Sequence, residues 1–319
     1  MDINLLLSWN KEFKLEKKFS LIGVLSLVFA MFIWASSFIG LKAAMNDYGA
    51  HTVIFTRMIF ASMCFLIFIK SFLKYEYTKK DILYILLLAL FEPCLYFLFE
   101  SKALQLTTAS QAGMITSLMP LITSVAAVFI LKELVSKQFI IGSFLAVFGA
   151  VWLSLEATSS ATAPNPILGN FLEFLAMACA AGYTVVAKHL TYKFSALFLT
   201  AIQAFIGAIF FMPLAFYELS NTEFIFKLDG FLWILYLGVV VTLGGYGLYN
   251  FSLTKIDASK ASIFMNLIPV FTLVLAYLIL NERLSIVEII ASIVILSGVF
   301  ISQIRVVIPR KLFKFFSKV

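Results

Sequence analysis

The sequence predicts an all-α membrane protein with ten transmembrane helices, arranged as two inverted repeats of five helices each. Three observations support this prediction: the composition, an internal repeat, and the distribution of lysine and arginine. Apolar residues make up 62% of the 319 residues, and charged residues make up only 13%. Soluble proteins contain about 25% charged residues, so this chain has about half the usual polar surface. We therefore expect lipid to surround most of it.

The chain contains an internal repeat. Residues 104–136 match residues 253–285 at 13 of 33 positions without a gap, at an offset of 149. Two prolines (Pro120 and Pro269) and two glutamates (Glu133 and Glu282) are among the matches. A repeat of this length indicates that the chain consists of two related halves.

Ten stretches are long enough to cross a bilayer, because a helix needs about 20 apolar residues to do so. We expect them near residues 21–42, 51–69, 82–103, 108–131, 138–156, 168–187, 195–216, 230–251, 261–280 and 286–304. Turn-forming residues separate several of them. The expected organisation is a cytoplasmic N-terminal segment at 1–20, the repeats at 21–156 and 168–304, and a basic cytoplasmic tail at 305–319.

Lysine and arginine indicate the orientation, because cytoplasmic loops of membrane proteins carry most of them. With the N-terminus in the cytoplasm, 19 of the 24 fall on the cytoplasmic side. The exceptions are Lys42, Arg57, Lys102, Lys227 and Arg283. Both termini are then cytoplasmic. Five spans per half is an odd number, so the second half enters the membrane inverted, which is a recurring transporter plan with the substrate site near the midplane.

Several motifs carry a resemblance to a known family. They are Trp34-Ala-Ser-Ser-Phe-Ile-Gly-Leu-Lys42, its second-half counterpart from Ala180 to Lys188, and the Leu-Lys-Glu and Leu-Asn-Glu ends of the fourth and ninth spans. Over roughly residues 21 to 304 the chain resembles EamA-type members of the drug/metabolite transporter superfamily. The resemblance implies an inner-membrane secondary transporter of small metabolites, amino acids or related compounds, working by alternating access. Lipid-intermediate flippases and drug exporters of the same superfamily are the alternatives.

Glu92 is the strongest single candidate for proton coupling. It lies 11 residues after Asp81, about 16 Å along a helix and so near mid-membrane. A carboxylate at that depth costs several kcal/mol unless it is paired, hydrated or protonated. Pro93 follows directly and favours a break in the helix. The alternative is a glutamate that hydrogen bonds keep protonated and that has no part in transport.

Arg57 is expected about 9 Å inside the external edge of its span. It could bind a substrate carboxylate with two hydrogen bonds. It could also pair with Glu100 at a similar height, or extend its charged group to the membrane surface.

Further aromatic, hydroxyl and amide side chains inside the spans are candidates for substrate binding. Each alone could instead join helices or sit in the interfacial belt. The candidates besides Arg57 are Trp34, Ser37, Tyr96, Ser117, Tyr183, Gln203, Tyr246, Asn250 and Asn266. Ser117 and Asn266 are repeat partners three residues before the matched prolines, where a broken turn would free carbonyl groups.

Other repeated residues have structural explanations. Glu133 and Glu282 are expected to accept hydrogen bonds from the first amides of the following helix, and a gating role is the alternative. Gly149 and Gly298 are expected to allow close helix contact. Lys42 and Lys188 are expected to extend to the membrane surface.

The sequence gives little support for other classes of function. Neither His-Glu-x-x-His nor Gly-x-Ser-x-Gly occurs, no nucleotide-binding Gly-x-x-x-x-Gly-Lys motif occurs, and the five aspartates are isolated. We therefore expect no enzyme activity and no cofactor or metal. The net charge of +7 reflects topology and contact with anionic lipid, so nucleic acid is not an expected partner. The expected partners are a small-molecule substrate and the bilayer, and the chain is expected to be a monomer or a weak homodimer.

Overall fold

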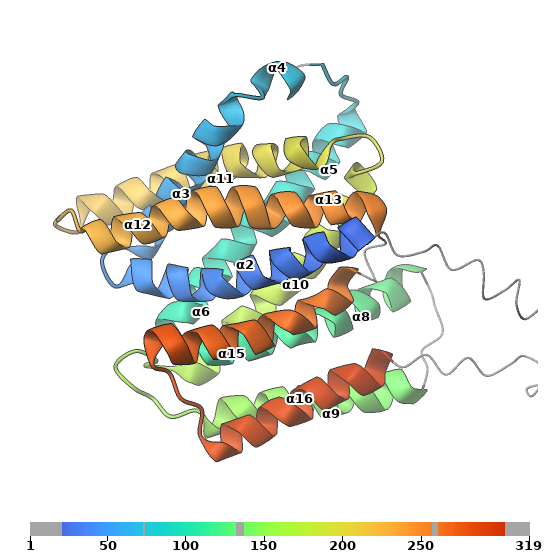
Figure 1. Cartoon of the computed structure of the whole chain (residues 1–319), viewed down its shortest axis with the longest axis vertical. Helices are drawn as coiled ribbons and strands as arrows, with labels where there is room; N and C mark the ends of the chain where they lie inside the picture. Colours follow the sequence, from blue (N-terminus) through green and yellow to red (C-terminus); the bar gives the residue numbers. More distant parts are fainter. Residues whose placement is uncertain (1–20, 73, 132–136, 257–260, 304–319) are drawn as a thin grey trace, which may run out of the picture.

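The computed structural model describes residues 21–303 apart from residues 73, 132–136 and 257–260. Its regular elements are helices, and Figure 1 shows them packed side by side with α9 and α16 together at one edge. The first repeat contains α2 (Leu21–Met45), α3 (Ala50–Leu66), α4 (Ile69–Phe72), α5 (Lys79–Ala89), η1 (Leu90–Leu95), α6 (Tyr96–Leu106), α7 (Ala109–Ile115), η2 (Thr116–Leu118), α8 (Met119–Leu131) and α9 (Lys137–Glu156). The second repeat contains α10 (Pro166–Leu190), α11 (Ala196–Ser220), α12 (Leu228–Tyr236), η3 (Leu237–Tyr246), α13 (Gly247–Lys255), η4 (Ser262–Asn266), α15 (Leu267–Leu280) and α16 (Ile286–Gln303).

Seven of these helical stretches are long and apolar enough to cross a membrane. They cover residues 21–45, 79–106, 137–156, 166–190, 196–220, 228–255 and 263–280. The other three expected spans correspond to α3, to the succession α7–η2–α8, and to α16. The chain is thus an all-α, multi-pass membrane protein, and the number of ten crossings stays a prediction.

Large apolar side chains cover much of the outer surface. Ile67, Phe144 and Phe300 have exposed fractions of 81%, 75% and 71%. Apolar exposure on this scale would be unfavourable in water and is typical of a surface in contact with lipid.

The two lysines at the span ends make equivalent contacts in the two repeats. Lys42 Nζ donates to the carbonyl oxygens of Thr107 (2.5 Å) and Thr162 (3.0 Å). Lys188 Nζ donates to the carbonyl oxygen of Ile256 (3.0 Å), and Ile256 is the repeat partner of Thr107 at the offset of 149. Both ammonium groups thus bind backbone carbonyl oxygens at the two ends of the bundle, and the expectation that they reach the membrane surface stays a prediction. We name the two ends of the bundle the Lys42 end and the Lys188 end.

The repeats are inverted, because their equivalent first helices run in opposite directions. The helix α2 begins at the Lys188 end, where Gly23 lies against Ile256. The helix α10 begins at the Lys42 end, where Gly169 lies against Thr107. A ten-span plan with five spans per half predicts this antiparallel arrangement.

Glu282 joins the two repeats at the Lys42 end. Its carboxylate accepts hydrogen bonds from the backbone amides of Ala109 (3.1 Å) and Ser110 (2.9 Å), which open α7. Lys42 Nζ lies 3.9 Å away. Glu282 therefore caps a helix of the other repeat, and the expectation that it caps the following helix is wrong. Its repeat partner Glu133 lies outside the described residues.

The third and eighth spans are both interrupted by π-helical segments at equivalent positions, η1 and η3. In η1, Glu92 has a non-helical backbone (φ −150°, ψ 117°) and precedes Pro93, which has no amide hydrogen to donate. The break predicted at Pro93 is confirmed. Such interruptions of long helices are frequent at functional sites.

The fourth and ninth spans change to 3₁₀ geometry before their matched prolines. The segments η2 and η4 immediately precede α8 and α15, which carry Pro120 and Pro269. The broken turns predicted there correspond to these 3₁₀ segments, and their freeing of carbonyl groups for a ligand stays a prediction.

Glycines bring α9 and α16 into close backbone contact. A Cβ atom placed on Gly298 would lie 2.4 Å from the backbone nitrogen of Ala146, and one on Gly149 would lie 2.8 Å from that of Ile295. The close contact predicted for these two glycines is confirmed.

Replacing Gly298 with alanine is therefore expected to force α9 and α16 apart. We expect Gly298→Ala to lower the free energy of unfolding by about 1–3 kcal/mol, because backbone atoms cannot make room as a side chain can. Thermal unfolding of the purified protein in detergent measures this. Gly247→Ala is the matched control, because no atom lies within 4 Å of a Cβ there. Equal melting temperatures for the two variants would contradict the prediction.

Candidate substrate pocket

An enclosed pocket lies between the two repeats. Glu92, which lines it, is near the middle of the 79–106 stretch, so the pocket lies about halfway through the bundle. The cavity that can admit water has a volume of about 30 Å³, enough for a few molecules. The pocket is therefore collapsed in this conformation. Its lining residues are Trp34, Ser37, Phe38, Arg57, Glu92, Tyr96, Phe97, Glu100, Thr116, Met119, Met177, Ala180, Val241, Tyr246, Met265 and Ile268.

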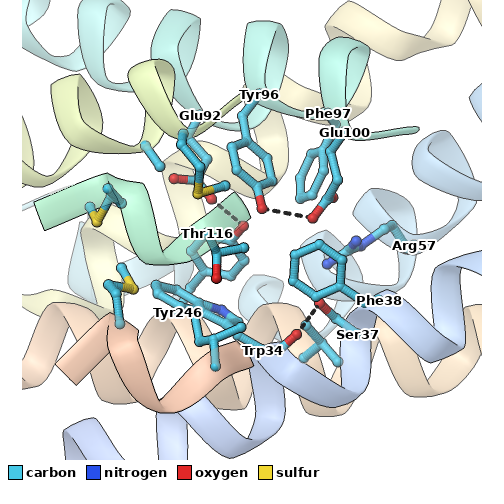
Figure 2. A pocket seen from close by; sticks show the side chains of 16 residues that line it. Trp34, Ser37, Phe38, Arg57, Glu92, Tyr96, Phe97, Glu100, Thr116 and Tyr246 are labelled. Atoms are coloured by element: carbon cyan, nitrogen blue, oxygen red, sulfur yellow. Dashed lines mark hydrogen bonds between the residues drawn. The ribbon is translucent and has the colours of Figure 1, made fainter. Parts of the chain in front are cut away.

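The break in η1 places the Glu92 side chain in the pocket. Figure 2 shows its carboxyl group directed toward Tyr246, whose hydroxyl donates a hydrogen bond to Glu92 Oε1. Gln203 Nε2 donates to the backbone carbonyl of Glu92 (2.9 Å) and so satisfies a group near the helix break. Only 3% of Glu92 is exposed. Two residues of the second repeat thus hold Glu92, Tyr246 at its carboxyl group and Gln203 at its backbone carbonyl.

Arg57 is buried at the other side of the pocket. Its Nη2 and Nε lie 3.2 and 3.4 Å from Thr242 Oγ1, and its Cζ lies 4.5 Å from the centre of the Phe97 ring. The ion pairs among the described residues are Lys42–Glu282, Lys193–Asp81 and Lys227–Asp47. The alternative in which Arg57 forms a direct ion pair with Glu100 is thus not realised. The guanidinium group instead contacts the Thr242 hydroxyl and the Phe97 ring. It therefore keeps N–H groups that can donate hydrogen bonds to a ligand.

A second carboxyl group faces the pocket from α6. Glu100 Oε1 accepts a hydrogen bond from the Tyr96 hydroxyl (2.7 Å), one helical turn earlier, and 2% of Glu100 is exposed. In Figure 2 Glu100 and Arg57 lie on the same side of the pocket. The pocket therefore contains two carboxyl groups and one guanidinium.

Aromatic rings form another part of the wall, beside methionine and aliphatic side chains. The ring of Trp34 lies 5.0 Å from that of Tyr246 and 4.8 Å from that of Tyr249. Trp34 Nε1 is buried and has no hydrogen-bond partner among the described residues, so it offers a free donor next to the pocket. Ser37 Oγ donates to the carbonyl oxygen of Trp34 (2.7 Å) and is occupied within its own helix.

The structure brings six of the predicted residues together in the pocket: Trp34, Ser37, Arg57, Glu92, Tyr96 and Tyr246. Three others form a hydrogen-bonded network outside the lining. Tyr183 donates to Asn250 (2.8 Å), and Asn250 Nδ2 lies 3.4 Å from Gln203 Oε1. Ser117 is fully buried and donates to Met114 O. Asn266 faces a separate groove between η4 and α16.

Glu173 was not among the residues that the sequence singled out. It is fully buried on α10, seven residues after Pro166. The reasoning applied to Glu92 would also have selected it, because it is a carboxyl group inside a predicted span. Thr242 and Phe97 contact Arg57, but they are uncharged and belong to no recognisable motif. Only their contacts in the structure show that they help to form the site.

The pocket has the chemistry of a binding site. Carboxyl groups can hold an amine, a guanidinium can hold a carboxylate, and tryptophan and tyrosine can cover an apolar portion.

Known proteins resemble this chain along most of its length. The model of the EamA-like transporter family matches residues 21–155 and 167–303. Uncharacterized transporter YetK of Bacillus subtilis (strain 168) is 30% identical over 235 residues, covering 72% of this chain and 70% of that protein. An uncharacterized transporter of Archaeoglobus fulgidus is 26% identical over 289 residues, covering 88% and 97%. A solved structure described as "Crystal structure of protein" has a TM-score of 0.60 at 17% identity, covers 91% and 98% of the two chains, and supports the fold alone.

Proposed function

Because this chain belongs to the EamA-like transporter family, we propose that it is a secondary carrier of small amphipathic metabolites that bear both an amine and a carboxylate, amino acids among them. It moves them across the cytoplasmic membrane by alternating access. The observation that supports this substrate class is the combination of Arg57, Glu92 and Glu100 in one aromatic-walled pocket between the repeats.

The charges suit a zwitterion. The free donors of Arg57 can take a carboxylate, and Glu92 or Glu100 can take an ammonium group. Burying opposite charges together costs far less than burying either alone. A small zwitterion with an apolar side chain would therefore complete the pocket, whereas a polyanion would face two carboxyl groups.

Alternating access follows from the inverted repeats. The excess of lysine and arginine on the N-terminal side favours an external Lys42 end and a cytoplasmic Lys188 end. Lys42 and Lys188 each bind a backbone carbonyl oxygen at one end of the bundle, and these equivalent contacts hold the two ends closed. Opening one end at a time would expose the pocket to one side of the membrane and widen it for a substrate.

Glu92 is the proposed site of proton coupling. It lies in the pocket, is hydrogen-bonded by Tyr246, and would have to exchange its proton with a charged substrate amine. Substrate and proton would then compete for one group, which links their movements.

Uptake by proteoliposomes tests the proposed function. The purified protein would be assayed with a panel of radiolabelled amino acids, with the matching amines that lack the carboxylate, and with nucleosides. We expect saturable uptake and counterflow for a subset of the amino acids. Transport of nucleosides alone, or flux without saturation or counterflow, would contradict the proposal.

A lateral groove favours a second candidate, the flipping of a lipid-like substrate. The groove is lined by η4, α15 and α16, and Phe300 at its rim is 71% exposed. Met265 and Ile268 face the central pocket, whereas Asn266 and Leu267 face the groove, so the junction of η4 and α15 is the wall between the two. Scrambling of a fluorescent phospholipid in proteoliposomes, with no amino acid uptake, would favour this function.

A further inference from the structure

Glu173 is a buried carboxyl group that the pocket does not include. It lies on α10 about 10 Å along the helix from Pro166, at the Lys42 end. Its exposed fraction is 0%, and neither carboxyl oxygen has a hydrogen-bond partner among the described residues. An isolated carboxylate in such a place would cost several kcal/mol, so Glu173 is expected to hold a proton in this conformation.

The titratable residues nearest to it lie on α6 and η1. Glu100 interacts electrostatically with Glu173, and so does Tyr96. Glu92 and Cys94 lie on η1, which also packs against α10. The segments α7, η2 and α8, which pack against α10 as well, contain no titratable residue. The helix α9 carries its titratable residues at its two ends, and α5 carries its own in its first half, where Tyr84 lies against His189. The helix α13 contributes Tyr249 and Lys255.

The charges of this cluster do not balance when all its carboxyl groups are ionised. Glu92, Glu100 and Glu173 share one guanidinium, that of Arg57, which interacts with Glu100 and Glu92. At least two of the three carboxyl groups must therefore be protonated when no substrate is bound. As a carboxylate, Glu173 would be the least stabilised of the three, because Glu92 and Glu100 each accept a hydrogen bond from a tyrosine hydroxyl.

Polar side chains connect the turn of Glu173 to the surface. Asn170, one turn earlier on α10, donates to Gln111 Oε1 (3.0 Å). Gln111 Nε2 donates to Glu288 Oε1 (2.7 Å), and Glu288 lines a hollow at the Lys42 end. On the other side, Glu100 and Tyr96 border the central pocket. Glu173 therefore lies between the pocket and the polar residues of the Lys42 end.

We propose that Glu173 is the proton-transfer group through which the pocket exchanges protons with the Lys42 end. This inference rests on the proposed proton-coupled carrier. When that end opens, Glu173 rotates or binds water, passes its proton to the Glu100 carboxylate, and is left as a carboxylate. It then takes a proton from water at the Lys42 end. Movement in reverse returns a proton from the pocket to that end.

Infrared difference spectroscopy tests this role without any substrate. Spectra of the full-length protein in liposomes would be recorded at acidic and alkaline pH. We expect Glu173→Gln to remove one component of the carbonyl-stretch band of protonated carboxylic acids, and Glu173→Asp to shift it. Glu156→Gln, at the exposed end of α9, is the control and should leave the Glu173 component of the band unchanged. A wild-type band that Glu173→Gln leaves intact, or a Glu173 component that never titrates while the protein stays folded, would overturn the proposal.

Proton flux gives the second measurement. Liposomes that contain the protein and a trapped pH dye would receive a pH step on the Lys42 side. We expect the protein-dependent proton flux to slow more than about tenfold in Glu173→Gln and to recover in part in Glu173→Asp. An unchanged rate would overturn the relay. If no amino acid is transported but both measurements succeed, the proposed substrate class fails while the proton site remains.

Discussion

Glu92→Gln should abolish accumulation driven by a pH gradient while sparing exchange of substrate for substrate. Glutamine has nearly the same shape, and its amide oxygen can still accept the hydrogen bond from Tyr246. It cannot release a proton, so a pH gradient no longer provides a driving force. Each coupled proton allows a concentration ratio of about tenfold per pH unit, and this ratio should fall to one.

Radiolabelled uptake with an imposed pH gradient and clamped membrane potential measures this ratio, and counterflow without a gradient measures exchange. Glu156→Gln is again the matched control, because that residue lies at the exposed end of α9. Unchanged accumulation in Glu92→Gln would remove Glu92 from the coupling mechanism. Loss of counterflow as well would mean that the substitution damages binding and not coupling.

Arg57→Met should weaken binding of zwitterionic substrates by about 10–100-fold, because a hydrogen-bonded charge contributes about 1.5–3 kcal/mol. Binding of the matching amine, which lacks the carboxylate, should not weaken, since the pocket then contains only carboxyl groups. Arg57→Lys should have an intermediate effect, because an ammonium group cannot form the same two parallel hydrogen bonds. Competition against a radiolabelled amino acid gives the affinities.

A structural role of Arg57 makes a different prediction. Removing the guanidinium leaves Glu100 without its nearest cation, and that alone could destabilise the protein. The double variant Arg57→Met/Glu100→Gln restores the balance of charge without restoring a carboxylate-binding group. If this variant regains affinity for zwitterions, Arg57 stabilises the fold and does not bind substrate.

The position of Glu92 along its helical stretch, the helix break at Pro93 and the contact glycines could be predicted from the sequence. The height of Glu92 follows from residue spacing, because a helix has a fixed rise per residue. The break follows from the missing amide hydrogen of Pro93, and the close contact follows from glycines at equivalent positions of the two repeats. The rotation of each helix does not follow in the same way. In spans that are apolar on most faces, hydrophobic periodicity says little about which side chain points inward.

Rotation and packing against the other repeat therefore separated candidates that looked alike in the sequence. Trp34 and Tyr246 meet across the repeats, whereas Tyr183 and Asn250 bind each other behind the pocket. Arg57 bonds to Thr242 on η3, a residue with no distinguishing motif. Glu282 caps α7 in the other repeat, which no spacing within its own repeat could indicate.

The sequence by itself determined that this protein lies in a membrane, that it is helical, and that its two halves are related. Composition and the repeat offset are properties of the chain, so they need no knowledge of contacts. The tertiary structure decided which polar groups share a pocket, and it placed Glu173 outside that pocket, buried and without a hydrogen-bond partner among the described residues. The physical reason is that a buried charge is stable only beside particular partners, and contacts between distant helices bring those partners together.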